Sequence, residues 1–195
     1  SCGMVMALGG IIMTKFATEL GLPVPVAILC GIGVTTLFGL LNGLLVTRIK
    51  LPPFIVTLGT LNIAFSITQL YSSSQTITDL PAGLTGLGTT FTIGSAEVAW
   101  GSVLMVALYG LAWFVLRETG AGRHIYAVGN NAEATRLVGI PTQRVLLGVY
   151  VAAGVLYGIA SLLSVARTGV GDPNAGQTEN LDAITAVVLL SLIHI

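Results

Sequence analysis

Apolar stretches alternate with short polar ones along almost the whole chain. Four of the apolar stretches contain no Asp, Glu, Lys, Arg or His, and they cover residues 26–46, 54–71, 98–116 and 145–166. A helix of about 20 apolar residues is long enough to cross the hydrocarbon core of a bilayer. The pattern therefore predicts an all-α fold, a polytopic transmembrane helix bundle forming one domain over residues 1–195.

Two shorter apolar segments lie at the ends of the chain. Residues 4–14 are too short to span a membrane, and we interpret them as the end of a helix that begins further upstream. Residues 181–195 begin a helix and stop before it could cross. We therefore expect partial spans at both ends and a sequence that is a fragment of a longer protein.

Composition supports contact with lipid rather than with water. Only 8% of the 195 residues are charged, whereas soluble domains carry about 25%. The formal net charge is zero, so no basic face is available and nucleic acid is excluded as a partner. Membrane lipid is the expected surroundings of the spans.

The basic residues predict the orientation in the membrane. Consecutive spans place loops 47–53 and 117–144 on one side, and loops 15–25, 72–97 and 167–180 on the other. Six of the eight Lys and Arg residues belong to the first pair of loops. Because Lys and Arg concentrate on the cytoplasmic side, we expect loop 117–144 to be cytoplasmic.

Loop 117–144 has the signals of a short helix. Asn131 is a good N-cap and Glu133 would lie in the first turn. Gly139 can take the left-handed conformation that ends a helix, and Pro141 prevents its continuation. We predict a helix over residues 132–138, with Glu133 and Arg136 beside an apolar side. Such a helix could insert into a groove of a partner protein, or it could be a well-formed loop with no partner.

The chain offers few groups for chemistry. The sequence contains no phosphate-binding loop of the G-x-x-x-x-G-K-[ST] type, so we expect no ATP site and no cofactor in this chain. His124 and His194 have no neighbouring Cys or His pattern, so no metal site is predicted. No residues form a Ser, His and acid combination, and no catalytic residue is proposed.

Neutral polar residues occur inside the second span. Thr57, Thr60, Asn62 and Gln69 could offer exchangeable hydrogen bonds to an uncharged polyol, and we predict that they face a translocation path. The alternative is that they bond neighbouring helices, which is worth about 0.6 kcal/mol each. The four complete spans lack ionisable residues, which disfavours an ion-driven transporter.

Two functional classes remain open from these residues, a transport channel driven by a separate ATPase and a membrane-embedded enzyme. The enzyme would need His, Asp or Glu clustered at one membrane face, and the sequence has no such cluster. The residues therefore favour transport, with ATP hydrolysis in a partner subunit.

Three segments carry a resemblance to a known family. They read "GLLNGLLVTRIKLPPFIVTLGTL" (39–61), "AGRHIYAVGNNAEATRLVGI" (121–140) and "ENLDAITAVVL" (179–189). In this order and spacing they resemble permease subunits of bacterial ABC importers for monosaccharides, of the ribose/xylose/galactose type (branched permease family 2). The resemblance implies an EAA-like coupling motif with Glu133, Ala134 and Gly139, beside Arg136; the family's frequent second Ala is Thr135 here. We expect the resemblance to end at Leu189, and residues 190–195 not to follow the family.

The resemblance also implies an architecture and partners. The fold would be part of a type II-like ABC importer permease, in the inner membrane of a bacterium, with a second permease copy as a homodimer. A cytoplasmic ATPase subunit, which binds ATP and Mg²⁺, would dock on the EAA-like helix. An extracytoplasmic sugar-binding protein would deliver a pentose or hexose, whose identity this chain leaves open.

Overall fold

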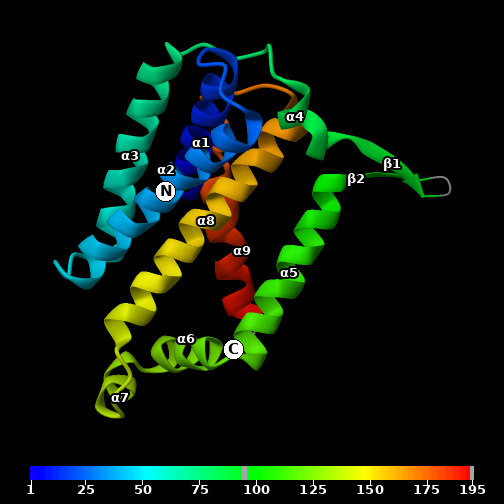
Figure 1. The fold of residues 1–195 in the computed structure, drawn as a ribbon. Helices are drawn as coiled ribbons and strands as arrows, with labels where there is room; N and C mark the ends of the chain where they lie inside the picture. The colour runs from blue at the N-terminus through cyan, green and yellow to red at the C-terminus, as the bar shows by residue number, and fades with distance from the viewer. Residues whose placement is uncertain (94–95, 194–195) are drawn as a thin grey trace.

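Helices make up most of the computed structural model, which describes residues 1–93 and 96–193 (Figure 1). In chain order the described elements are α1 Cys2–Thr18, α2 Val24–Thr47, α3 Pro53–Ser72, α4 Ala82–Thr85, the 3₁₀ turn η1 Gly86–Gly88, strands β1 Thr90–Ile93 and β2 Ala96–Ala99, and helices α5 Trp100–Glu118, α6 Gly120–Asn130, α7 Ala132–Leu137, α8 Thr142–Thr168 and α9 Glu179–Ile193.

The four predicted spans are present as helices. Helices α2, α3, α5 and α8 are each long and apolar enough to cross a membrane, which confirms the all-α bundle. Helix α5 begins at Trp100 rather than at Val98, because Val98 and Ala99 belong to β2 and pair with β1. This antiparallel hairpin, together with α4 and η1, occupies most of the predicted loop 72–97 and extends to Ala99.

Helix α1 lies at the centre of the described bundle. Leu8, Ile11 and Met13 are at most 1% exposed, and the helix packs against α2, α3 and α8. An apolar helix covered on several sides has no polar face to offer to water. The segment predicted over residues 4–14 is helical over Cys2–Thr18 and is held inside the bundle.

Helices α2 and α8 approach each other along a line of glycines. A Cβ built on Gly39 would come within 3.1 Å of Gly154 Cα, and one built on Gly158 within 2.8 Å of Ile32 Cα. Gly43 faces Leu147 and Tyr150 in the same way. Small residues spaced four apart permit this close backbone approach between membrane helices. The Gly39–Gly43 and Gly154–Gly158 pairs therefore let α2 and α8 pack closely.

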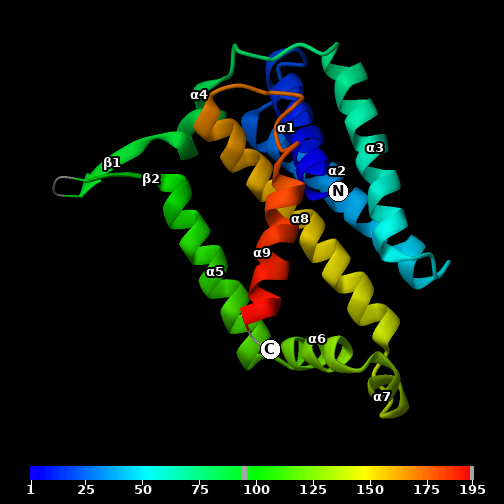
Figure 2. The same cartoon turned by 180° about the vertical axis from the view of Figure 1, so that it is seen from behind.

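The loops gather at two opposite ends of the bundle (Figures 1 and 2). The α2–α3 connection and helices α6 and α7 lie at one end, in the lower half of Figure 1, and we call it the basic end. The α1–α2 and α3–α4 connections and the hairpin lie at the other, which we call the opposite end. This alternation is the one that the sequence predicts.

The segment between α8 and α9 departs from that prediction. We expected residues 167–180 to form a loop at the opposite end, but only its beginning is there, where Gly171 contacts Thr14 near the end of α1. The segment then returns along α1, so that Gly176 lies against Gly3 and the side chain of Asn180 accepts a hydrogen bond from Gly3 N (3.1 Å). Helix α9 consequently begins about halfway along α8 and runs toward the basic end (Figures 1 and 2).

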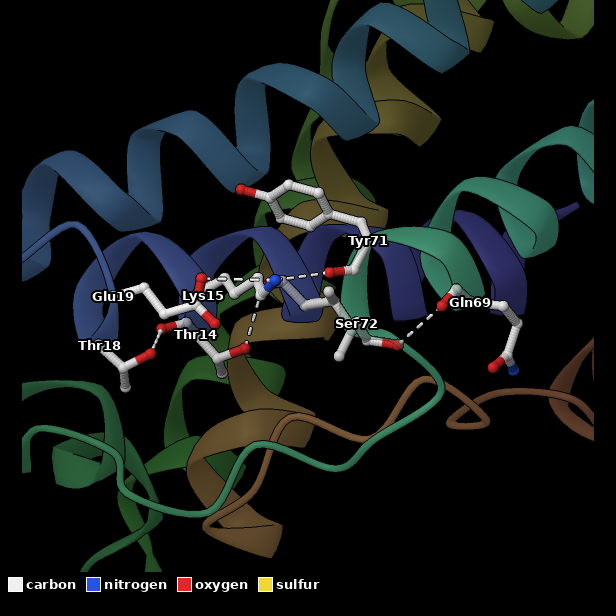
Figure 3. Close-up of polar contacts among 8 residues, drawn as sticks. Thr14, Lys15, Thr18, Glu19, Gln69, Tyr71 and Ser72 are labelled. Carbon is white, nitrogen blue, oxygen red and sulfur yellow. Dashed lines mark hydrogen bonds and ion pairs between the residues drawn. The ribbon is translucent and has the colours of Figure 1, made fainter.

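A lysine joins α1 to the end of α3 (Figure 3). Lys15 Nζ donates a hydrogen bond to the Tyr71 carbonyl oxygen (2.7 Å) and lies 4.6 Å from the centroid of the Tyr71 ring. The same ammonium is 3.4 Å from Glu19 Oε2. The last carbonyls of a helix lack partners within that helix and carry partial negative charge. Lys15 therefore caps α3 as it links the two helices.

Candidate functional site

The candidate site at the basic end is built on a helix that sequence reasoning missed. Helix α6 follows α5 after a sharp bend at Thr119, whose Oγ1 donates to the Val115 carbonyl oxygen (2.6 Å) and accepts from Gly122 N (3.3 Å). Gly122 lies so close to the Leu116 carbonyl that a Cβ there would overlap it. Helix α6 crosses the basic end between α5 and α8 (Figure 1), and it carries α7.

Helix α7 has the ends that the sequence predicted. The Asn131 side chain accepts hydrogen bonds from Glu133 N (3.1 Å) and Ala134 N (2.9 Å), as an N-cap does. At the other end Gly139 has φ +87°, Gly139 N donates to Arg136 O, and Ile140 N donates to Thr135 O. This pair of bonds is the Schellman motif, which requires a left-handed residue at the position of Gly139.

Thr135 fixes α7 against α6, and its role was not foreseen. Its side chain is 5% exposed, and its hydroxyl lies 2.8 Å from the Ala127 carbonyl oxygen on α6 and 2.7 Å from that of Asn131. A buried Ala at this position could not donate this bond. The only sequence signal was the departure of Thr135 from the alanine frequent in the resembling family.

The remaining side chains of α7 point away from the bundle. Glu133, Ala134 and Arg136 are exposed, and within the described part of the chain neither Glu133 nor Arg136 forms an ion pair. Leu137 and Val138 are 84% and 76% exposed. The helix thus presents two large apolar side chains next to one acid and one base. We call these four residues, together with Ala134, the α7 tip.

The predicted path residues of α3 do not gather in one place. Thr60 is buried, Thr57 and Gln69 are half-buried and Asn62 is exposed. Thr57, Thr60 and Asn62 donate to carbonyl oxygens of α3 itself, at 3.1, 3.2 and 3.1 Å. Gln69 Nε2 instead donates to Asn174 Oδ1 in the returning segment (2.9 Å).

No metal site was expected, and the described residues contain no group of three or more His, Cys, Asp or Glu side chains that could hold a metal ion. His124 lies on α6 and is exposed. His194 lies outside the described residues.

Comparison with known proteins identifies the class. Residues 1–194 match the family described as the branched-chain amino acid transport system / permease component. The chain belongs to this family, and it is a multi-pass membrane protein. The match reaches residue 194, so our expectation that the resemblance ends at Leu189 was wrong.

The curated relatives are sugar import permeases. The chain is 42% identical over 194 residues to the fructose import permease protein FrcC of Rhizobium meliloti, covering 97% of this chain and 54% of that protein. It is 34% identical to the ribose import permease protein RbsC of Haemophilus influenzae (97% and 58% covered). It is 31% identical to the galactose/methyl galactoside import permease protein MglC of the same organism (88% and 52% covered).

The chain therefore spans a little over half the length of these relatives. No solved structure matches it.

Proposed function

We propose that this chain is part of the transmembrane permease subunit of an ATP-binding-cassette importer for a monosaccharide. The observation that carries the proposal is the family match over residues 1–194, together with three sugar import permeases at 31–42% identity. The four complete spans contain no Asp, Glu, Lys, Arg or His, which agrees with the transport of an uncharged solute. The sugar itself stays open, because the relatives are named for fructose, ribose and galactose.

The proposed setting follows from the same class. The permease lies in the bacterial inner membrane with its basic end in the cytoplasm, as the excess of Lys and Arg there favours. It pairs with a second permease copy, receives sugar from an extracytoplasmic binding protein, and is driven by a cytoplasmic ATPase that binds ATP and Mg²⁺. Because this sequence lacks a phosphate-binding loop, the purified permease should hydrolyse no ATP until that ATPase is added.

We further propose that the α7 tip is where the ATPase docks. Leu137 and Val138 expose apolar surface that gains free energy when it is covered by a partner, at about 25 cal/mol per Å². Glu133 and Arg136 beside them are unpaired within the described residues and can pair with charges of opposite sign. The capped ends and the Thr135 hydrogen bond would let α7 move as a rigid unit. A movement of the docked ATPase would then be passed through α7 to α6 and to the spans.

The backbone at Gly139 allows a sharp test of this docking role. No atom lies within 4 Å of a Cβ built at Gly139, so Gly139→Val acts only through its positive φ, at a cost of about 1–2 kcal/mol. In the reconstituted importer, we expect Gly139→Val and Glu133→Arg to insert normally, but to co-purify little ATPase and to support little uptake. Gly139→Asn should keep most activity, because Asn tolerates the left-handed conformation.

The matched control is Gly129→Val on neighbouring α6, where a Cβ also meets open space but φ is not positive. It should retain wild-type docking and uptake. If Gly139→Val and Glu133→Arg both bind the ATPase and transport as the wild type does, the docking role is wrong.

Thr57, Thr60, Asn62 and Gln69 stay candidates for the translocation path. The support for this role is weaker than the support for docking at the α7 tip. Each of these four side chains already donates a hydrogen bond within the described chain.

A further inference from the structure

A polar cavity lies between α1, α8 and the returning segment. Its volume is about 250 Å³, and its polar lining comes from Ser161, Ser164 and Thr168 on α8, Asp172 in the segment and Glu179 at the start of α9. None of these residues belongs to the α7 tip or to the α3 candidates. The sequence did carry a signal, since residues 161, 164 and 168 follow the spacing of one helix face.

The backbone around this cavity is unusual for a membrane protein. Residues 170–176 are not helical, yet they run beside α1 from Thr14 to Gly3. Irregular backbone at membrane depth is tolerated only where it is buried in protein or lines a water-filled cavity. Helices that begin inside the membrane next to such segments are a recurring feature of substrate sites in transporters.

Ser161 is the second, independent feature of the cavity. Its side chain is 1% exposed, and its hydroxyl has no hydrogen-bond partner among the described residues. A Cβ built on Gly9 or Gly10 of α1 would come within 3.2 Å of Ser161 Oγ, so the hydroxyl packs directly against these two glycines at the wall of the cavity. A buried polar group without a partner destabilises the fold. A ligand hydroxyl in the cavity would remove that cost.

The carboxylates of the cavity are arranged as acceptors. Asp172 is half-buried, and one of its oxygens accepts a hydrogen bond from Asn174 N (2.9 Å). Glu179 lies in the first turn of α9, where the helix dipole favours a negative charge. None of the described residues that line the cavity is basic, so it offers hydroxyls and carboxylates and does not suit an anion.

We propose that this cavity binds a neutral polyhydroxylated solute, a single pentose or hexose, on its way through the permease. Sites for drug-sized ligands measure about 300–1,000 Å³, so a cavity of about 250 Å³ suits one small ring. Asp172 and Glu179 accept hydrogen bonds from the sugar, and Ser161 and Ser164 can donate or accept. The proposal rests on the proposed function and names the residues that hold the sugar.

The first experiment measures transport by the whole importer in proteoliposomes, with full-length permease, ATPase and binding protein. Ser161→Ala, Asp172→Asn and Glu179→Gln should each lower uptake of the labelled sugar about 2- to 12-fold, as expected for one lost hydrogen bond. ATP hydrolysis and binding-protein affinity should stay unchanged. Ser66→Ala and Asp79→Asn, which lie outside the cavity, are the matched controls and should transport normally.

Ser161→Ala also separates a solute contact from a structural role. The substitution removes a hydroxyl that has no partner among the described residues, so the thermal unfolding midpoint should stay the same or rise. Lower uptake with an unchanged or higher midpoint supports the proposal. Lower uptake with a lower midpoint means that Ser161 serves packing, and that result counts against the proposal.

The second experiment probes binding directly with Ser164→Cys in a permease whose other cysteines are replaced. An impermeant thiol reagent should label this cysteine, and saturating ribose, fructose or galactose, whichever the wild type carries, should slow the labelling. Thr78→Cys, exposed at the opposite end, should label at the same rate with and without sugar.

The outcomes distinguish this proposal from the proposed function. If the wild-type importer carries none of a panel of pentoses and hexoses that includes these three sugars, the proposed function fails. If the wild type transports but Ser161→Ala, Asp172→Asn and Glu179→Gln transport equally well, the cavity proposal alone is overturned. It is also overturned if Na⁺, and not sugar, slows labelling at Ser164→Cys, since the cavity is then a cation site.

Discussion

Lys15 shows how one charged residue can be accommodated in a chain that is otherwise almost free of charge. Its side chain is only 18% exposed, and three groups surround the ammonium: the Tyr71 carbonyl, the Tyr71 ring and the Glu19 carboxylate. The hydrogen bond from Lys15 to the end of α3 should contribute more to the free energy of unfolding than the ion pair with Glu19. The reason is that the Glu19 side chain is 63% exposed, so solvent screens its charge.

We therefore predict that Lys15→Met destabilises the permease through the loss of the α3 cap. The expected loss is about 1.5–3 kcal/mol, the usual range for a hydrogen bond to a charged group. The measurement is an SDS unfolding titration of the full permease in mixed micelles. Glu19→Gln is the matched control and should cost less than about 1 kcal/mol; equal losses for the two variants would show that the ion pair, and not the cap, is the important contact.

At the scale of elements, the glycines of α8 fall into two kinds. Gly154 lies against α2, where a Cβ would come within 2.7 Å of the Thr35 carbonyl oxygen. Gly148 lies on the same helix, and a Cβ there would meet no atom within 4 Å. The two positions share a residue type and a helix and differ in contact with a neighbouring helix.

We predict that Gly154→Val separates α2 from α8 and lowers the yield of folded permease, whereas Gly148→Val does not. Forced overpacking of a close helix contact costs about 1–3 kcal/mol. The measurement is the monodisperse fraction on size-exclusion chromatography together with the thermal midpoint. Equal behaviour of the two variants would mean that the α2–α8 contact contributes little to folding.

At the scale of the whole molecule, the loops at the two ends differ in charge. We predict that Ala132→Cys at the α7 tip's N-terminal side is shielded from an impermeant thiol reagent in intact cells, and that Thr78→Cys is labelled. Both residues are exposed in the structure, so a difference in labelling reports the side of the membrane. The measurement uses a permease in which Cys2, Cys30 and any cysteine outside this sequence are replaced, and permeabilised cells should label both introduced cysteines. The reverse pattern in intact cells would invert the orientation.

The sequence determined those features that depend on neighbouring residues. A spanning helix is recognised by its length and hydropathy, so α2, α3, α5 and α8 could be predicted with small errors at their ends. The caps of α7 follow from Asn131 and Gly139 for the same reason, since N-capping and the left-handed stop involve only residues a few positions apart. Helix α6 was missed because its glycines and polar residues obscured the spacing of apolar residues that indicates a helix.

Only the tertiary structure decided what depends on residues far apart in the chain. Nothing local indicates that Gly154 meets Thr35 and Gly39, or that Gly176 returns to Gly3 across 173 positions of sequence. The polar segment after α8 reads as a surface loop, because glycine, proline and asparagine favour turns in any surroundings. Its path inside the bundle, and with it the cavity around Ser161, arises because the small residues of α1 allow the backbone to approach closely.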